Sequence, residues 1–117
     1  MDILDPVKVK IAKDKYELLK GSYGFRTVPE VINYTFQLLS DIQTYKVSDI
    51  NTFLHTNGDI LILLFGKTYS IEILIVTDKT VDITIKDFND NVIKHNLGMN
   101  LREAKRTLKS DSKYLIL

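Results

Sequence analysis

The feature that most constrains the fold of this chain is a series of short segments rich in isoleucine and valine. They cover residues 60–65, 69–76 and 81–88, and Gly66-Lys67 and residues 77–80 separate them. Apolar runs of this length between polar, turn-forming residues are typical of β-strands. The pattern therefore predicts an antiparallel β-meander. With 117 residues, the chain has room for one compact domain or two very small ones.

The faces of these strands are predicted to differ. Val81, Ile83 and Ile85 alternate with polar residues, so the third strand has one wet face. Residues 60–65 are apolar at every position, which favours a central strand with both faces covered.

A closing helix is predicted after the strands. Asn100 and Glu103 have the spacing of a capping box, and Leu101, Ala104 and Leu108 form one apolar stripe. The apolar tail at 114–117 is a candidate for pairing with a sheet edge.

The first part of the chain has a different pattern. Residues 7–11 alternate between apolar and basic side chains, which is typical of a strand with one buried face. Residues 14–20 predict a short helix that stops at Gly21. Thr27 and Glu30 predict a capping box for a second helix, which continues to about Ile42 and is apolar on more than one face.

This succession resembles the ribbon-helix-helix family of DNA-binding domains. The resemblance covers residues 7–43, about a third of the chain, and its most specific part is Gly-Phe-Arg-Thr-Val-Pro-Glu-Val-Ile at 24–32. In that family two chains pair their strands into a ribbon that enters the major groove of DNA. The resemblance therefore implies an obligate dimer.

The resemblance also implies roles for individual residues. Lys8 and Lys10 would read bases, because a lysine can donate to guanine O6 or N7. Arg26, Thr27 and Val28 would meet a phosphate at the start of the second helix. The dimer core would contain Val7, Val9, Ile11, Val31 and Ile32.

These patterns together predict an α+β fold of two domains. Residues 1–46 would be a ribbon-helix-helix DNA-binding and dimerisation domain. Residues 47–117 would be an antiparallel β-meander with a closing helix, serving oligomerisation or partner binding. The charge agrees with this division: residues 7–26 hold six basic and two acidic side chains, whereas residues 47–99 hold four basic and seven acidic ones. The net charge of +1 conceals this difference.

Several classes of function have no support in the sequence. Cysteine is absent, and His55 and His95 are isolated, so no metal site, no cofactor and no catalytic residue is predicted. Glycine-rich phosphate loops and nucleophile elbows are absent, so an enzyme is not expected. The sequence contains neither a signal-peptide pattern nor an apolar run of about 20 residues, which predicts a cytoplasmic protein without a membrane partner.

The predicted function is that of a homodimeric, sequence-specific DNA-binding protein, most simply a transcriptional repressor, with double-stranded DNA as its partner. An alternative is an antitoxin or immunity-type inhibitor that binds a protein and uses the ribbon only for dimerisation. In either case residues 47–117 could bind a protein partner.

Overall fold

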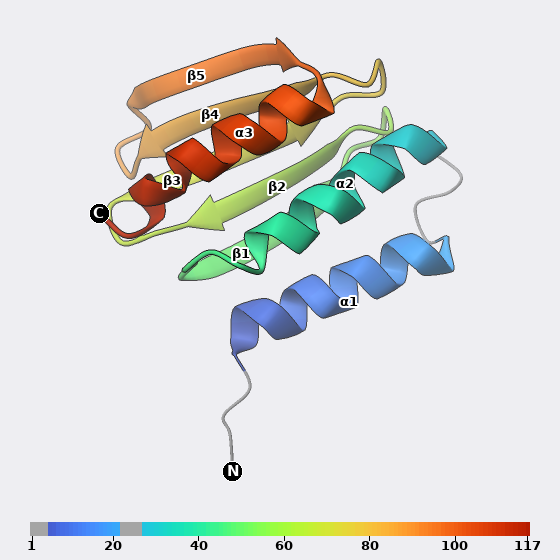
Figure 1. Ribbon diagram of the computed structural model, residues 1–117, viewed down its shortest axis with the longest axis horizontal. Helices are drawn as coiled ribbons and strands as arrows, with labels where there is room; N and C mark the ends of the chain where they lie inside the picture. The colour runs from blue at the N-terminus through green and yellow to red at the C-terminus, as the bar shows by residue number, and fades with distance from the viewer. Residues whose placement is uncertain (1–4, 22–26) are drawn as a thin grey trace.

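The computed structural model describes residues 5–21 and 27–117, in which two helices precede an antiparallel sheet and a third helix follows it (Figure 1). The elements are α1 (Pro6–Lys20), α2 (Pro29–Ile42), β1 (Asp49–Leu54), β2 (Ile60–Phe65), β3 (Tyr69–Ile75), β4 (Val81–Asp87), β5 (Val92–Met99), α3 (Leu101–Asp111) and the 3₁₀ helix η1 (Ser112–Leu115).

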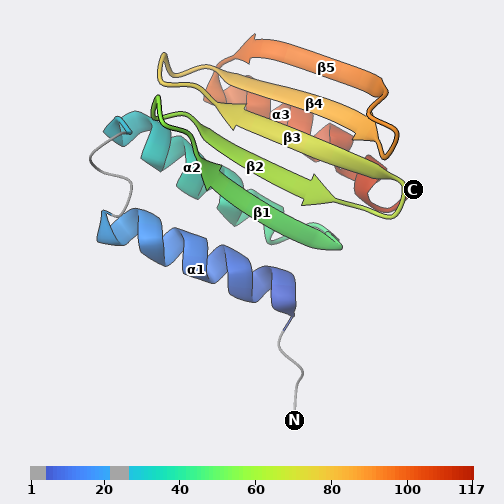
Figure 2. The ribbon, with the colours of Figure 1, turned by 180° about the vertical axis from the view of Figure 1, so that it is seen from behind.

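The sheet is a five-stranded meander in the order β1-β2-β3-β4-β5, and each strand is antiparallel to its neighbours (Figure 2). Strands β2, β3 and β4 lie where the sequence predicts strands, and β1 and β5 extend the meander at its two edges. The register pairs Ile62 with Ile73 and Ile73 with Ile83. This pairing places isoleucines side by side on one face, which is the face that enters the core.

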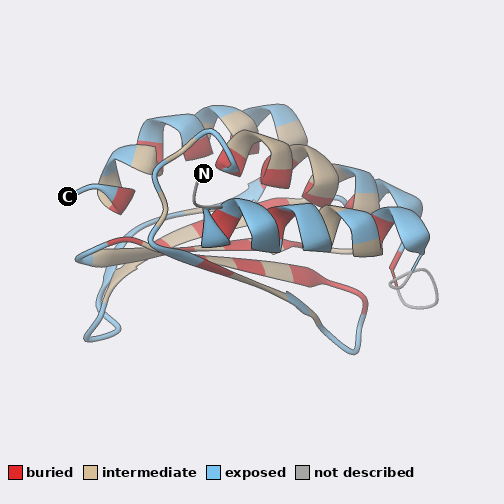
Figure 3. Ribbon diagram, turned by 90° about the horizontal axis from the view of Figure 1, so that it is seen from below, coloured by how far each residue is buried: buried red, intermediate tan, exposed pale blue. Residues whose placement is uncertain are grey.

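All three α-helices lie on the same face of the sheet (Figure 3). Helix α1 packs against β1 and α2, and α3 packs against β4 and β5. One hydrophobic core fills the space between the layers, and side chains from both sides of residue 46 enter it. Its fully buried members include Ile11, Leu38, Leu39, Ile50, Ile62, Ile73, Ile83, Ala104 and Leu108.

The prediction of a ribbon-helix-helix start is wrong, because residues 7–11 belong to α1. The helix begins directly after Asp5, whose carboxylate accepts a hydrogen bond of 2.9 Å from Val7 N, and Pro6 occupies its first turn. It ends at Gly21, which has a φ of 84°. An aspartate N-cap followed by proline is a helix-start signal, and it outweighs five residues of alternation. Residues 7–11 therefore do not supply the strand that the ribbon of this family requires.

The predicted capping box at Thr27 and Glu30 is also wrong. The N-cap of α2 is Val28, which gives no side-chain cap, and the Thr27 hydroxyl instead donates to the carbonyl of Gly58 at 3.0 Å. Thr27 is buried, so its hydroxyl joins the start of α2 to the β1–β2 turn.

The end of the chain confirms one prediction and corrects another. The Asn100–Glu103 capping box is present, with Glu103 N donating to Asn100 Oδ1 at 2.8 Å. The tail forms η1 rather than a strand, and Leu115 is buried in the core. No helix in the described ranges combines the length and the apolar character that a bilayer span requires.

Candidate binding surfaces

The two lysines that the resemblance assigns to base reading lie on α1 and make different contacts. Lys10 Nζ donates to Asp49 Oδ1 at 2.6 Å and to the carbonyl of Ile50 at 3.2 Å, so it holds α1 against β1. Lys8 lines a cleft near the start of α1. Consecutive helical residues point about 100° apart, so Lys8 and Lys10 do not share one flat surface as they would on a strand.

The residues expected in the dimer core and at the phosphate also lie in different surroundings from one another. Val7, Ile11 and Val31 are buried inside the single chain and Ile32 is partly buried, whereas Val9 is 49% exposed. Of the expected phosphate contacts, Thr27 is buried and bonded to Gly58, and Val28 is exposed at the start of α2. Arg26 lies outside the described residues.

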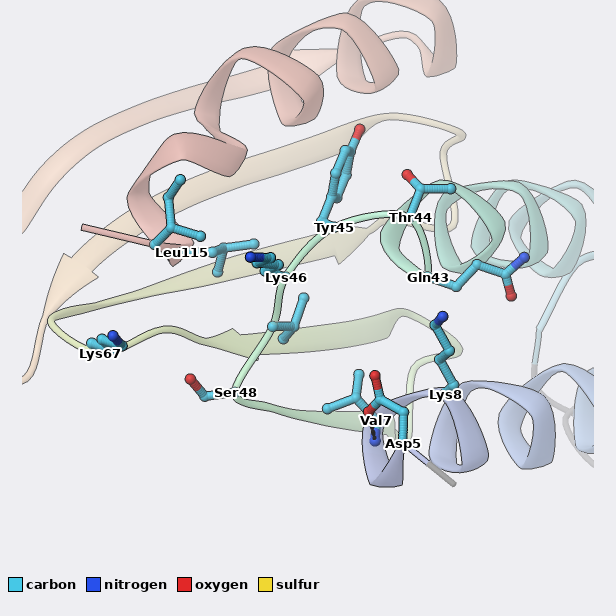
Figure 4. Close-up of a pocket in the computed structure, with 12 residues that line it drawn as sticks. Asp5, Val7, Lys8, Gln43, Thr44, Tyr45, Lys46, Ser48, Lys67 and Leu115 are labelled. Carbon is cyan, nitrogen blue, oxygen red and sulfur yellow. Dashed lines mark hydrogen bonds between the residues drawn. The ribbon is translucent and has the colours of Figure 1, made fainter. Parts of the chain in front are cut away.

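A cleft of about 600 Å³ opens between the first turn of α1, residues 43–48 and the end of η1 (Figure 4). Three exposed lysines line it, from three different segments: Lys8, Lys46 and Lys67. Burial raises the pKa of the Tyr45 hydroxyl in its wall, and the nearby Asp41 carboxylate raises it further. Exposed lysines on flexible stems attract anions without orienting them, so the cleft lacks the held, convergent polar groups of a specific ligand site.

The face of the sheet opposite the helices is a second candidate surface, because no described element covers it (Figure 3). Leu61, Leu63 and Phe65 alternate with the buried residues of β2, so they lie on this uncovered face, and they are partly exposed. The register places Phe53 beside Leu61 and Leu61 beside Leu74, which forms an apolar row across three strands.

Polar side chains limit this apolar row. Asp82 lies beside Leu74 in the register, and Lys86 pairs with Glu72 at 3.1 Å. Thr84 and His95 are paired on β4 and β5. The apolar row therefore has polar neighbours on the uncovered face, with Asn51 and Glu72 on either side of Leu63 and Asp82 beyond Leu74.

The histidines and carboxylates of the described residues do not form a metal site. Over residues 5–21 and 27–117, no group of three or more His, Cys, Asp and Glu side chains is arranged to hold a metal ion. Asp78 and Asp87 accept hydrogen bonds from Thr80 and Asn91 in their own turns, and these bonds lower their pKa values. Their role is to close the β3–β4 and β4–β5 turns.

Comparison with known proteins gives no relative from which a function could be transferred. No protein-family model, curated protein or solved structure matches the chain. Any functional inference therefore depends on the surfaces themselves.

The uncovered apolar row is not among the functional residues predicted from the sequence, although a signal for it is present. Residues 60–65 are apolar at every position, and this pattern predicts a strand covered on both faces. The structure covers one face of β2 and leaves Leu61, Leu63 and Phe65 on the other. The apolar residues on the second face of β2 are thus the sequence signal for the uncovered apolar row.

Proposed function

We propose that this protein is a protein-binding module whose partner docks on the uncovered face of the sheet. The observation that carries the proposal is the apolar row Phe53, Leu61 and Leu74, which crosses three strands without a covering element among the described residues. An antiparallel sheet with one solvated face normally carries polar residues there. Contiguous apolar side chains on such a face are typical of an interaction surface.

The surroundings of the row favour a protein over other partners. Protein interfaces combine an apolar centre with a polar rim, and here the rim contains Asp82 and the Glu72–Lys86 ion pair. Carboxylates at the rim repel the phosphates of nucleic acids and anionic lipids.

DNA binding through a ribbon is not retained, because it requires residues 7–11 to form a strand and they are helical. The alternative that the sequence already suggested, an inhibitor of the antitoxin or immunity type, belongs to the class proposed here. It no longer needs a ribbon, because the docking surface lies on the sheet.

Two matched phenylalanine variants test the proposal. Phe53 is 47% exposed on the uncovered face, and Phe88 is 58% exposed in the β4–β5 turn. We expect the full chain, tagged and produced in its natural cells, to co-purify with a protein in near-equal amount. The Phe53→Ser variant should lose this protein about tenfold or more, and Phe88→Ser should keep it.

The melting temperatures of both variants show whether each is folded. A Leu61→Ser variant gives a second test within the same row. Absence of a stoichiometric partner, or equal binding by all variants, would overturn the proposal.

A further inference from the structure

Helix α1 has a second apolar face, which points away from the core. Val7, Ile11 and Leu18 are buried beneath the helix, whereas Val9, Tyr16 and Leu19 are 49%, 62% and 75% exposed. These three exposed residues and the exposed Ala12 follow the spacing 9, 12, 16 and 19. Intervals of three, four and three residues are those of the a and d positions of a coiled-coil heptad. We call Val9, Ala12, Tyr16 and Leu19 the outer stripe.

Lysines occupy the positions that flank the outer stripe on both sides. With Val9 and Tyr16 at a positions, the flanking g and e positions are Lys8, Lys13, Lys15 and Lys20. Lys8, Lys13 and Lys20 make no ion pair with any described residue, and Lys15 Nζ lies 4.6 Å from the centre of the Phe36 ring of α2. The two acidic residues of α1, Asp14 and Glu17, are half-buried and lie off the stripe.

The basic flanks of α1 distinguish between the molecules that could bind the outer stripe. A second copy of α1 would place lysines opposite lysines in either orientation, because both flanks are basic, and like charges at these positions oppose pairing. Nucleic acid would use the lysines but would leave the apolar stripe between them without a partner. A helix with an apolar seam and acidic flanks satisfies both features at once.

A lipid surface fits less well. Helices that lie on membranes bury a broad apolar face. The broad face of α1 is already in the core through Val7, Ile11 and Leu18, which leaves only the narrow outer stripe. The stripe runs from Val9 to Leu19, a helical length of about 15 Å, which corresponds to a short line of contact between two helices.

We propose that the outer stripe of α1 binds an amphipathic helix of a partner protein whose apolar seam is flanked by glutamate or aspartate. This site is separate from the uncovered face of the sheet, and it does not depend on the function proposed for that face.

The test uses two designed peptides of about three heptads, both with leucine at a and d. One carries glutamate at e and g, and the other carries lysine there. Binding to the full chain is measured by calorimetry at low and physiological salt. We expect the glutamate peptide to bind and to weaken as salt is added, and we expect the lysine peptide not to bind.

Variants of α1 and matched controls locate the site. The Tyr16→Ser/Leu19→Ser variant should weaken binding about tenfold or more, whereas Leu97→Ser, on a leucine of β5 that is 63% exposed, should not. The Lys13→Glu/Lys20→Glu variant makes one flank acidic and leaves Lys8 and Lys15 on the other, so it should lose the preference for the glutamate peptide. The control Arg106→Glu/Lys109→Glu on the exposed side of α3 should keep the original preference.

Four results would overturn the proposal. They are absence of binding to the glutamate peptide, equal binding by all variants, and a dimer of the chain alone that Leu19→Ser abolishes in analytical ultracentrifugation. The fourth combines two observations: the chain binds phosphatidylserine vesicles but not the glutamate peptide, and the Tyr16→Ser/Leu19→Ser variant no longer binds the vesicles. This result would assign the stripe to a lipid surface. The substituted side chains are exposed, so circular dichroism should show the native fold in each variant.

Discussion

Lys10 of α1 lies 2.6 Å from the Asp49 carboxylate of β1, and the same ammonium group donates to the carbonyl of Ile50. A lysine that the alternating pattern assigned to an open strand face therefore joins the first helix to the first strand. This contact adds to the packing of Val7, Ile11 and Leu18, which holds α1 against the sheet, while Val9, Tyr16 and Leu19 of the outer stripe stay exposed.

The Lys10–Asp49 contact predicts a change in one carboxyl titration. The hydrogen bond from Lys10 holds the pKa of Asp49 below its ordinary value, so the stabilisation is present above the ordinary carboxyl pKa and is lost as the pH falls through the lowered one. The Lys10→Met variant should raise the pKa of Asp49 towards its ordinary value. A carboxyl-detected NMR titration measures this, with Lys8→Met as the control. An unchanged Asp49 titration in Lys10→Met would contradict the contact.

The pair between β5 and α3 predicts a loss of stability. Lys94 Nζ donates to Asp111 Oδ1 at 2.7 Å, and the Asp111 side chain is only 2% exposed. The Lys94→Met variant leaves a buried carboxylate without its partner, which should lower the free energy of unfolding by about 1–3 kcal/mol at neutral pH. Urea unfolding measures the change.

A double variant separates the ion pair from other effects. Lys94→Met/Asp111→Leu removes both charges and should recover part of the lost stability, because no unpaired buried carboxylate remains. The hydrogen bond to Asp111 raises the pKa of Lys94, so the pair stabilises the fold below the ordinary lysine pKa and stops doing so as the pH rises through the raised one. Equal stability of Lys94→Met and wild type at pH 7 would refute the pairing.

A close approach of two backbones predicts the effect of a single methyl group. A Cβ at Gly66 would lie 2.6 Å from the carbonyl oxygen of Leu115 and 2.8 Å from its Cα. Gly66→Ala should therefore displace η1 and lower the free energy of unfolding by about 1–3 kcal/mol. The neighbouring Lys67 is exposed, so Lys67→Ala should change stability by less than about 0.5 kcal/mol. Thermal unfolding should give a lower melting temperature for Gly66→Ala than for Lys67→Ala. Similar melting temperatures would argue against the close contact between Gly66 and Leu115.

The Asp59 side chain predicts a local effect on the β3–β4 turn. Its carboxylate accepts a hydrogen bond of 2.9 Å from Thr77 N and another of 2.9 Å from Asn57 Nδ2. Asp59→Ala removes both and should cost about 1–2 kcal/mol of stability, with faster hydrogen exchange at the Thr77 amide. Asp59→Asn keeps an oxygen that can accept from Thr77 and should largely preserve the protection of that amide. Unchanged exchange in Asp59→Ala would disprove the link.

The parts of the fold that could be predicted from the sequence have strong local signals. Strands β2, β3 and β4 follow from short runs rich in isoleucine and valine between turns, and the start of α3 follows from the Asn100–Glu103 capping box. These signals depend on residues within a few positions of one another. Strands β1 and β5 lack them: β1 holds polar residues such as Asn51 and Thr52, and most of β5 is exposed.

The start of the chain shows where local patterns become ambiguous. Val7, Val9 and Ile11 fit a strand with period two, but Val7 and Ile11 also fit the i and i+4 positions of one helical face. Asp5 and Pro6 favour the helix, and burial of Val7 and Ile11 against the rest of the core completes that face. Five residues are too few for the pattern alone to distinguish the two periods.

The sequence alone determined the three central strands, the turns between them and the closing helix, because strand patterns and capping act over short stretches of chain. Only the tertiary structure decided which apolar surfaces are covered. Both faces of β2 and both faces of α1 carry apolar residues, and the three-dimensional packing buries one of each. The faces that stay open, Phe53 with Leu61 and Leu74 on the sheet and the outer stripe on α1, are the candidate binding surfaces. Burial depends on contacts between segments far apart in the chain, and short sequence patterns do not specify those contacts.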